Sequence, residues 1–221
     1  MYLLVTSRKG ISSMQLAKEI GVTQKSAWFV LQRLREACGN DPTVLKGIIE
    51  VDECYIGGKE SNKHESKKLH RGRGATGKTA VIGMRERGGR VKAMILPFVN
   101  AVSLQGCVVE NVSLGSEIQT DEHPGYIGLE DIYYHDTVNH RDGEYARPGV
   151  NTNSIESVWA VLKRGLHGVY HHASPKHLDR YVQEFAFRLN DGNVKRHTMD
   201  RLDSFIAASS GLRLTYERLT A

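Results

Sequence analysis

The sequence predicts an α/β fold in which a mixed five-stranded sheet with flanking helices follows a small helical segment. Two amphipathic helical patterns open the chain, and three β-branched segments follow them. After Pro97, helical and strand patterns alternate to the C-terminal third. At 221 residues, the chain is long enough to bury one sizeable core and a small appendage.

The composition is that of a soluble globular protein, with 40% hydrophobic and 25% charged residues. No apolar run is long enough to cross a membrane, and the N-terminus lacks a secretory pattern, so we expect no membrane partner. Cys38, Cys54 and Cys107 are far apart and form no CxxC pair. This spacing predicts reduced thiols in a cytoplasmic protein, without disulfides or a cysteine zinc site.

The net charge of +5 is unevenly distributed along the chain. Residues 59–100 carry +8 and residues 157–221 carry +4, whereas residues 101–156 between them carry −8. An acidic centre between basic segments suits a protein that holds divalent cations and binds a polyanion around them. Chance clustering of surface charge is the alternative.

Residues 12–39 read as two helices joined by a turn at Gly21, the first capped by Ser12-Ser13 and the second by Thr23. This pattern is typical of a helix-turn-helix, whose second helix contacts DNA. We predict that Lys25 and Arg33 bind DNA. A helical hairpin that only packs is the alternative. The residues of the second helix that we expect to reach DNA phosphates or bases are Gln24, Lys25, Gln32, Arg33 and Arg35.

Residues 45–57 are rich in β-branched side chains and read as a strand that ends at Gly57. Alternation places Glu50 and Asp52 on one face and Glu53 on the other. A carboxylate within an apolar strand is costly unless it is paired or bound to metal. Asp52 is therefore a stronger functional candidate than Glu50 at the start of the strand, and an edge strand with a wet face is the alternative.

Residues 59–79 form a polar, basic, glycine-bearing segment with a formal phosphate-binding-loop match from Gly72 to Thr79. Such a loop needs a strand before it and a helix after it. Here a hydrophilic tract precedes the match and a hairpin turning at Gly88 follows it. We predict that the match is spurious, reject a P-loop nucleotidase, and expect the loop with Lys78 to contact a nucleic-acid backbone.

Beyond Pro97 the patterns predict a helix, two short strands and a loop over 103–112, 116–122, 130–136 and 137–152. Asp121 stands at the end of the first of these strands. Carboxylates at the C-terminal ends of strands commonly face a ligand crevice. A turn-initiating Asp before Pro-Gly is the alternative.

A helix that follows Asn151 carries Glu156, and we expect Ser154 to be its N-cap. Glu156 and Lys163 share a face and stand about 10.5 Å apart along the helix axis. This spacing suits a helix on which Glu156 binds a metal ion and Lys163 binds an anionic group further along. An ordinary amphipathic helix with a solvated charged face is the alternative. The apolar stripe of this helix is Ile155, Trp159, Leu162 and Leu166.

A three-strand meander followed by alternating helices and strands is the ribonuclease H plan. In that plan Asp52, Asp121 and Glu156 can converge at one edge of the central strand pair. Three close carboxylates cannot all stay ionised without a cation, and hard oxygen ligands suit Mg²⁺ or Mn²⁺. Two such ions, about 3.5–4 Å apart, stabilise the attacking and leaving oxygens of an in-line phosphoryl displacement.

Over about residues 12–192 the chain resembles the DDE-type insertion-sequence transposases of bacteria and archaea, in the group with an ISXO-like transposase domain. The most specific match runs over 151–190, through Asn151-Thr-Asn-Ser-Ile-Glu156 and Leu162-Lys163-Arg164-Gly165. The shorter matches are Ile49-Glu-Val-Asp52-Glu-Cys-Tyr-Ile-Gly-Gly-Lys59, Gly77-Lys-Thr79, Thr120-Asp121-Glu122 and Val138-Asn-His140.

This resemblance implies a catalytic, metal-binding triad of Asp52, Asp121 and Glu156, the use of two Mg²⁺ or Mn²⁺ ions, and DNA contacts from Lys163 and Arg164. It implies metal-dependent hydrolysis at transposon ends, then attack of the freed 3′-hydroxyl on target DNA without a covalent enzyme intermediate. The implied partners are transposon-end and target DNA, with a homo-oligomer assembled on DNA. The implied location is the prokaryotic cytoplasm, in association with the nucleoid.

The domains expected are a helix-turn-helix segment (1–42), a ribonuclease H-like catalytic domain (43–192) and a C-terminal helical tail (193–221). Related proteins usually carry a cysteine zinc ribbon before the helix-turn-helix. This chain has none, so we expect a shortened copy. The alternative function is a catalytically inactive helix-turn-helix DNA-binding protein derived from a transposase.

The histidines near the C-terminal third are not spaced as zinc ligands, because Ser174-Pro175 interrupts them. We expect surface or DNA-phosphate roles for them, and for His140 either orientation of a water or substrate or packing of its loop. The histidines concerned are His167, His171, His172 and His177.

Overall fold

The computed structural model of the protein describes the chain except for Arg8, Asn40, Lys59, 70–74, 139–145, Pro148 and 192–195. Its contacts divide the chain into two compact units. Residues 43–160 form one, called here the sheet unit, and residues 1–42 with 161–221 form the other, the helical unit. In the described part of the chain, no helix is both long and apolar enough to cross a membrane.

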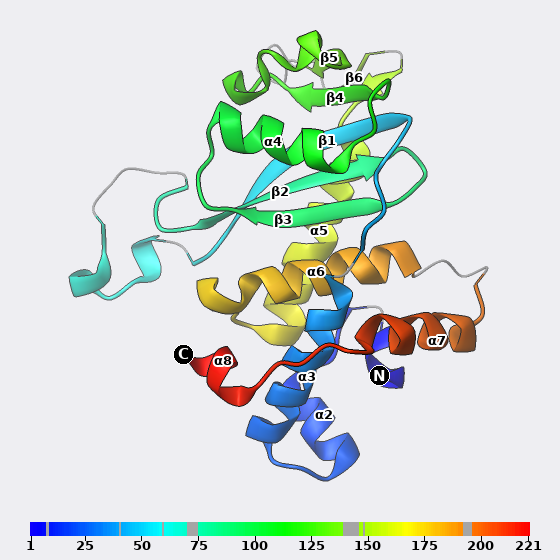
Figure 1. Cartoon of the computed structure of the whole chain (residues 1–221). Coiled ribbons are helices and arrows are strands. Elements are labelled where there is room, and N and C mark those ends of the chain that lie inside the picture. The colour runs from blue at the N-terminus through cyan, green and yellow to red at the C-terminus, as the bar shows by residue number, and fades with distance from the viewer. Residues whose placement is uncertain are drawn as a thin grey trace. The chain divides into compact units, whose positions relative to one another are not determined.

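The sheet unit is built on five strands in the order β3-β2-β1-β4-β5 (Figure 1). β1 pairs antiparallel with β2 and parallel with β4, while β2–β3 is antiparallel and β4–β5 parallel. The predicted mixed five-stranded sheet is confirmed, and the edge-strand alternative for β1 is wrong because β1 is bonded on both sides. The strands are β1 (Ile48–Ile56), β2 (Thr79–Glu86), β3 (Val91–Leu96), β4 (Glu117–Asp121) and β5 (Tyr134–Val138).

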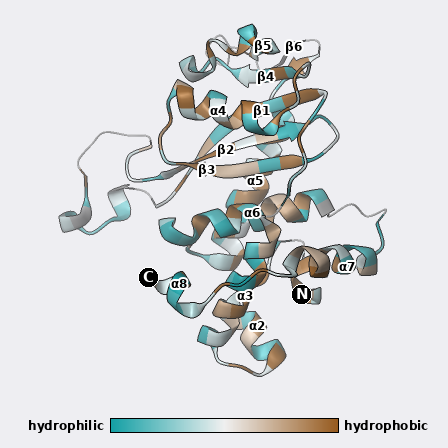
Figure 2. Ribbon diagram, in the orientation of Figure 1, coloured by the Kyte–Doolittle hydropathy of each residue, from teal (hydrophilic) through white to brown (hydrophobic). Residues whose placement is uncertain are grey.

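Two helices cover opposite faces of this sheet (Figure 1). α4 (Ala101–Asn111) contributes Leu104 to a core that includes Val51 of β1, and Figure 2 shows hydrophobic residues along the central strands. α5 (Asn153–Gly165) lies against the other face, where a Cβ on Gly83 would come within 2.4 Å of the Trp159 ring. The glycine therefore lets the indole lie directly on β2. The residues of α5 beyond 160 belong to the helical unit.

The connections agree with most sequence expectations. β2 and β3 form the predicted hairpin, with Gly88 at a φ of +73° in its turn. A strand rather than a helix follows Lys78, as expected for a spurious phosphate-binding loop, although 72–74 of that match lie outside the described residues. The basic connection before β2 contains two 3₁₀ turns, η1 (Glu60–Asn62) and η2 (Glu65–Lys67).

Two expectations around β5 were wrong. The strand begins at Tyr134 rather than at 130, because Leu129 is fully buried in a 3₁₀ turn before it. The segment predicted as a loop contains a two-stranded ladder that precedes α5. The elements concerned are η3 (Pro124–Tyr126), η4 (Leu129–Asp131), β6 (Ala146–Arg147) and β7 (Val150–Asn151).

The helical unit confirms both predicted N-terminal caps. Ser12 Oγ accepts a hydrogen bond from Gln15 N at 3.1 Å, and Thr23 Oγ1 accepts one from Ser26 N at 3.2 Å. Gly21 ends α2 at a φ of 67°, which favours glycine. The elements are α1 (Tyr2–Thr6), α2 (Ser13–Ile20), α3 (Gln24–Cys38), a π-helical turn (Leu166–Tyr170), α6 (Pro175–Asp191), α7 (Thr198–Ser209) and α8 (Tyr216–Thr220).

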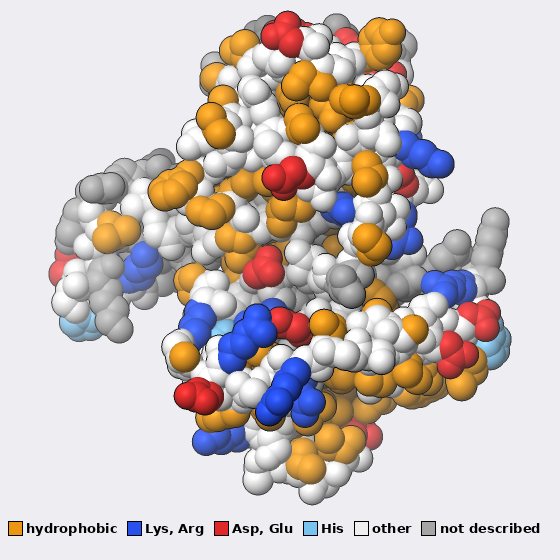
Figure 3. Space-filling view, viewed as in Figure 1, with side chains coloured by type: hydrophobic (Ala, Val, Ile, Leu, Met, Phe, Trp, Pro, Cys, Tyr) orange, Lys and Arg blue, Asp and Glu red, His pale blue; other side chains and the backbone are white. Residues whose placement is uncertain are grey.

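On α3, two residues expected to reach DNA are instead buried. Gln32 is 0% exposed and Arg35 is 1% exposed, because Arg35 faces α6 and pairs with Glu184 there. Lys25 and Arg33 are exposed on the same helix. Figure 3 shows Lys and Arg side chains on the outer surface of the helical unit. A DNA contact by this unit stays a prediction.

Candidate active site

The candidate site lies where two parallel strands separate. The β1–β4 ladder ends at the pair Glu50–Gln119. Asp52 and Asp121 each stand two residues further along their strands. Because the strands run in the same direction, both carboxylates lie beyond the last paired residues at the carboxyl end of the pair, where α/β sheets commonly bind ligands.

A third carboxylate joins these two. Asp52, Glu53 and Asp121 each offer an oxygen, and the three oxygens lie within 4.8 Å of one another. Asp52 faces α5, because its Oδ2 accepts a hydrogen bond from Trp159 Nε1 at 2.9 Å. Glu53 faces the opposite side of β1, toward Tyr126, as alternation predicts. Asp121, at the end of the neighbouring strand, is close to both.

The surroundings of Asp52 disfavour its ionised form. Burial raises the pKa of Asp52 to about 6, and the charges of Asp121 and Glu156 add to this rise. Hydrogen bonds from the Trp159 indole and from Glu53 N, at 2.7 Å from Asp52 Oδ1, oppose it. A cation beside this carboxylate would reverse the balance, because it favours the charged form.

Glu53 is affected in the same direction. Burial raises the pKa of Glu53 to about 7, the Tyr126 phenol opposes the rise, and the charges of Asp121 and Asp52 reinforce it. Among the described residues, Glu53 Oε1 and the Tyr126 hydroxyl are buried without a partner inside ordinary hydrogen-bond limits, although the phenol is close enough to act on the pKa of Glu53. A buried carboxylate oxygen without a full partner is available to a ligand.

This donor set fits a hard divalent cation. The donors are all carboxylate oxygens that lie close together, and burial disfavours the charged forms of Asp52 and Glu53 in the absence of a counterion. Mg²⁺ and Mn²⁺ prefer such oxygen ligands. Asp52, Glu53 and Asp121 are therefore the residues that could hold such a metal.

Glu156 lies outside this group of three. It is exposed in the first turn of α5, and its charge nevertheless contributes to the raised pKa of Asp52. The structure thus brings Asp52 and Asp121 together and leaves Glu156 near enough to act on Asp52 through its charge. Its role as a third metal ligand stays a prediction.

The sequence reasoning missed Glu53 as a site residue and misplaced Ser154. Alternation assigned Glu53 to the face away from Asp52, but the adjacent acidic pair Asp52-Glu53 within an apolar strand was a signal for both. Ser154 is not the N-cap, because α5 already begins at Asn153. Its hydroxyl donates to Glu50 Oε2 at 2.6 Å instead.

The predicted DNA-binding residues occupy several elements. Lys78 is half-buried just before β2, and Lys163 and Arg164 are exposed in the last turn of α5. Lys25 and Arg33 are on α3, where Lys25 Nζ lies 5.0 Å from the centre of the Tyr216 ring. Their contacts with DNA stay predictions.

The histidines form no metal-ligand cluster in the part of the chain that the structure describes, where the acidic group is the one found with suitable spacing. His140, and with it most of the matched stretch Val138-Asn-His140, lies outside the described residues. The histidines concerned are His167, His171, His172 and His177.

Comparisons with known proteins found the following similarities. Residues 44–190 match the ISXO2-like transposase domain. Over 192 residues the chain is 28% identical to an uncharacterized protein in the transposable element ISH50 of Halobacterium salinarum, covering 82% of this chain and 65% of that relative. The chain thus spans less than two thirds of that relative's length. A crystal structure of a pre-cleavage Mos1 transpososome matches with a TM-score of 0.34 and 13% identity, covering 96% of this chain and 78% of that one.

Proposed function

The chain belongs to the ISXO2-like transposase domain family, and from this premise we propose that it is a DNA transposase that cuts and joins DNA strands with the help of divalent metal. The observation that carries the proposal is the gathering of Asp52, Glu53 and Asp121 within 4.8 Å at the point where β1 and β4 separate. This arrangement supports metal-dependent chemistry better than it supports a purely DNA-binding role.

In the proposed reaction, Asp52 and Asp121 would hold Mg²⁺ or Mn²⁺, and Glu53 and Glu156 are the candidates for further ligands. When bound, two such ions supply Lewis-acid stabilisation of the attacking and leaving oxygens. The carboxylates ionise to hold them, and the Trp159 N–H fixes the direction of the Asp52 carboxylate.

Two successive phosphoryl transfers follow. Water displaces the 3′ oxygen from a phosphodiester at the transposon end, which leaves a free 3′-hydroxyl. That hydroxyl then attacks the phosphorus of a target phosphodiester. A P–O bond to the transposon end forms, and the P–O bond to the target's own 3′ oxygen breaks.

DNA binding is proposed for the basic residues outside the acidic cluster. Lys163 and Arg164 follow Glu156 on α5, Lys78 precedes β2, and Lys25 and Arg33 are exposed on α3. The strongly positive segments of the sequence support this role. Transposon ends and target DNA are the proposed partners, bound by a homo-oligomer. Phosphate contacts release counterions, so we expect affinity to fall steeply with salt.

Nicking of a supercoiled plasmid in Mn²⁺ tests the proposal without knowledge of the end sequence. Wild type should convert the plasmid to the nicked form. Asp121→Asn keeps the shape but removes a charge, and loss of metal catalysis worth several kcal/mol corresponds to about 1000-fold or more in rate. Salt-dependent plasmid binding by the same variant is the control for folding.

Two other outcomes would contradict the proposed site or the proposed activity. Nicking by Asp121→Asn at the wild-type rate would contradict the assigned site. Salt-dependent binding by wild type without nicking would instead support an inactive helix-turn-helix DNA-binding protein, for which the capped α2–α3 pair is the favourable observation.

A further inference from the structure

A buried polar network lies directly behind the candidate carboxylates, and its spacing in the sequence is regular. Glu50, Gln119 and Ser154 each stand two positions before one of Asp52, Asp121 and Glu156. On a strand, residues two apart share a face. Glu50 and Gln119 therefore lie on the same sides of β1 and β4 as the two aspartates, one step toward the paired part of the sheet.

Glu50 joins β1 to the first turn of α5. Its side chain is 1% exposed, and its Oε2 accepts hydrogen bonds from Ser154 N at 2.8 Å, Ser154 Oγ at 2.6 Å and Ile155 N at 3.2 Å. The first N–H groups of a helix have no partner within the helix, and a negative charge there is favourable. The carboxylate of Glu50 thus fixes the position of the first turn of α5, which also carries Glu156.

Arg87, which follows β2, binds the other oxygen of Glu50. Its Nε and Nη2 each donate to Glu50 Oε1 at 3.2 Å, and Nη2 also donates to Gln119 Oε1 at 2.6 Å. Nη1 donates to Gly149 O at 2.7 Å, and Nη2 approaches Asn151 O at 3.3 Å. A planar guanidinium can serve several acceptors at once, which a single ammonium cannot do in the same geometry.

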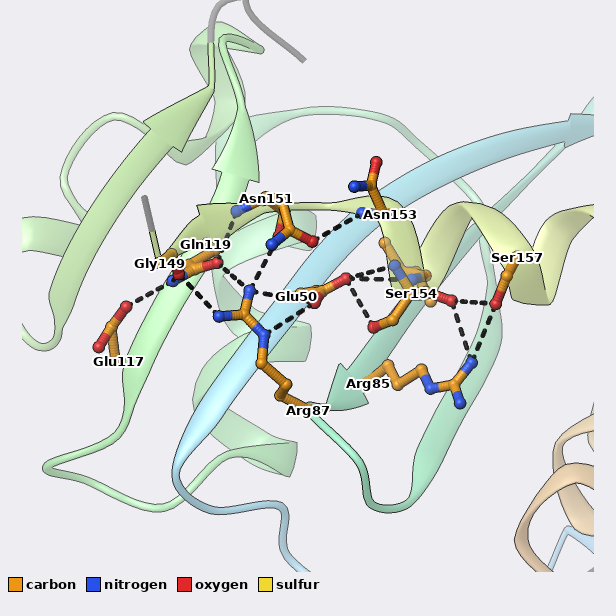
Figure 4. Close-up of polar contacts among 11 residues, drawn as sticks. Glu50, Arg85, Arg87, Glu117, Gln119, Gly149, Asn151, Asn153, Ser154 and Ser157 are labelled. Atoms are coloured by element: carbon orange, nitrogen blue, oxygen red, sulfur yellow. Dashed lines mark hydrogen bonds and ion pairs between the residues drawn. The ribbon is translucent and has the colours of Figure 1, made fainter. Parts of the chain in front are cut away.

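Gln119 completes the connection from β4 to the segment before α5. It is 0% exposed, its Nε2 donates to Gly149 O at 2.9 Å, and its Oε1 accepts from Asn151 N at 3.0 Å. Figure 4 shows Arg87 in the middle of the group, between Gln119 and Glu50, with Ser154 beyond Glu50. One network therefore bonds β1, β4 and α5, the three elements that carry the candidate triad.

We propose that Glu50, Arg87, Gln119 and Ser154 are positioning residues that hold the carboxylates of the metal site in their relative places, an inference that rests on the proposed function. Apolar contacts of Ile155 and Trp159 already pack α5 on the sheet. Burying an ion pair adds little or nothing to stability relative to apolar packing. Directed hydrogen bonds add a fixed position and direction, which a metal site requires.

Mn²⁺ affinity, measured by electron paramagnetic resonance of the free ion, tests this proposal. Glu50→Gln puts an amide NH₂ where a carboxylate oxygen accepted hydrogen bonds, and we expect a loss of about 10- to 100-fold, the effect usual for residues that support metal ligands. Arg87→Lys should lose Mn²⁺ affinity as well, because lysine keeps the positive charge but cannot donate to Glu50, Gln119 and Gly149 in the geometry of the guanidinium.

Two further variants separate positioning from folding. Glu36→Gln makes the same chemical change in the helical unit, where Glu36 pairs with Arg180 at 2.8 Å, and should leave the Mn²⁺ affinity as in wild type. Ser154→Ala removes one hydroxyl from a half-buried position and should lower the affinity in the same direction as Glu50→Gln, by less. Hydrogen exchange at the Ser154 and Ile155 amides should accelerate in Glu50→Gln while the circular dichroism stays unchanged.

The outcomes separate this proposal from the proposed function. Wild-type Mn²⁺ binding that Asp52→Asn abolishes, together with wild-type affinity in Glu50→Gln and Ser154→Ala, overturns the positioning role and leaves the metal site standing. If Glu50→Gln does not fold, the affinity of Ser154→Ala decides by itself. Wild type without any Mn²⁺ binding overturns both.

Discussion

Two buried glutamates, Glu50 in the sheet unit and Glu184 in the helical unit, use similar chemistry with different partners. Glu184 is 0% exposed, its Oε2 pairs with Arg35 Nε at 2.6 Å, and its Oε1 pairs with Arg188 and accepts a hydrogen bond from the Tyr170 hydroxyl. Glu50 has one arginine partner, Arg87, whose side chain is 32% exposed, and its other oxygen binds the start of a helix.

The difference shows what a buried charge does in each unit. Glu184 connects side chains of α3, α6 and the π-helical turn, and the Arg35 guanidinium also lies 4.0 Å from the centre of the Tyr181 ring. That network holds a helical core together. Glu50 instead binds backbone N–H groups next to a predicted metal ligand, so its network holds a site. Loss of Glu184 should therefore affect stability, and loss of Glu50 should affect metal binding.

The largest effect is expected from Glu184→Gln. The substitution leaves Arg35 and Arg188 buried with one negative charge fewer, and breaking a buried pair in this way costs about 3–5 kcal/mol. Urea unfolding in a Trp159→Phe background would measure it, because Trp28 is then the single tryptophan and reports on the helical unit. A loss below about 1 kcal/mol, the range of an exposed pair, would contradict the comparison.

A smaller effect is expected from Gly83→Ala in the sheet unit. The new Cβ would lie 2.4 Å from Trp159 and 2.8 Å from Ile155, and overpacking of this kind costs about 1–3 kcal/mol. Displacing the indole should also weaken its hydrogen bond to Asp52 and slow plasmid nicking.

Gly106→Ala on α4 is the matched control for this substitution. A Cβ there meets nothing within 4 Å, and alanine favours a helix over glycine by about 1 kcal/mol. Gly106→Ala should therefore leave nicking unchanged and keep or raise stability. Equal behaviour of the two variants would show that the contact between Trp159 and the sheet is not tight.

A pH dependence is expected in the sheet unit. The pKa values of Asp52 and Glu53, about 6 and about 7, are raised from 3.8 and 4.5. Without metal, their contribution to stability is therefore fully present below about pH 4 and is lost as pH rises through 6 and 7. Mn²⁺ binds the ionised forms, so its affinity should rise with pH by up to about tenfold per unit for each proton released.

Mn²⁺ titrations from pH 5 to 8 would measure this dependence. Glu53→Gln should flatten the upper part of the curve, because the group with the higher pKa is removed. An affinity that does not change between pH 5 and 8 would show that neither carboxyl gives up a proton to the metal.

Much of the fold could be predicted from local patterns, and the site only in part. β-branched runs, glycine turns and the Ser12 and Thr23 caps are local signals, and each led to the observed element. Asp52 could be found because an acid within an apolar strand is costly unless it is paired or bound to metal, and Asp121 because it stands at the C-terminal end of a strand.

The networks could not be predicted, because their partners are distant in the sequence. Ser154 is 104 residues from Glu50, and Glu184 is 149 residues from Arg35. For the same reason Arg35 read as one more basic residue on a helix that faces DNA. The closeness of Glu53 to Asp121 depends on how β1 and β4 separate, and the alternation of side chains along one strand does not predict this.

The most direct test of the metal site is a crystal structure of the protein soaked in Mn²⁺, with anomalous differences recorded at the manganese edge. We expect an anomalous peak within coordination distance of both Asp52 and Asp121 carboxylates, with Glu53 or Glu156 as a further ligand. If Mn²⁺ binds elsewhere in the crystal and Asp52 and Asp121 share no ion, the catalytic centre is not at the point where β1 and β4 separate.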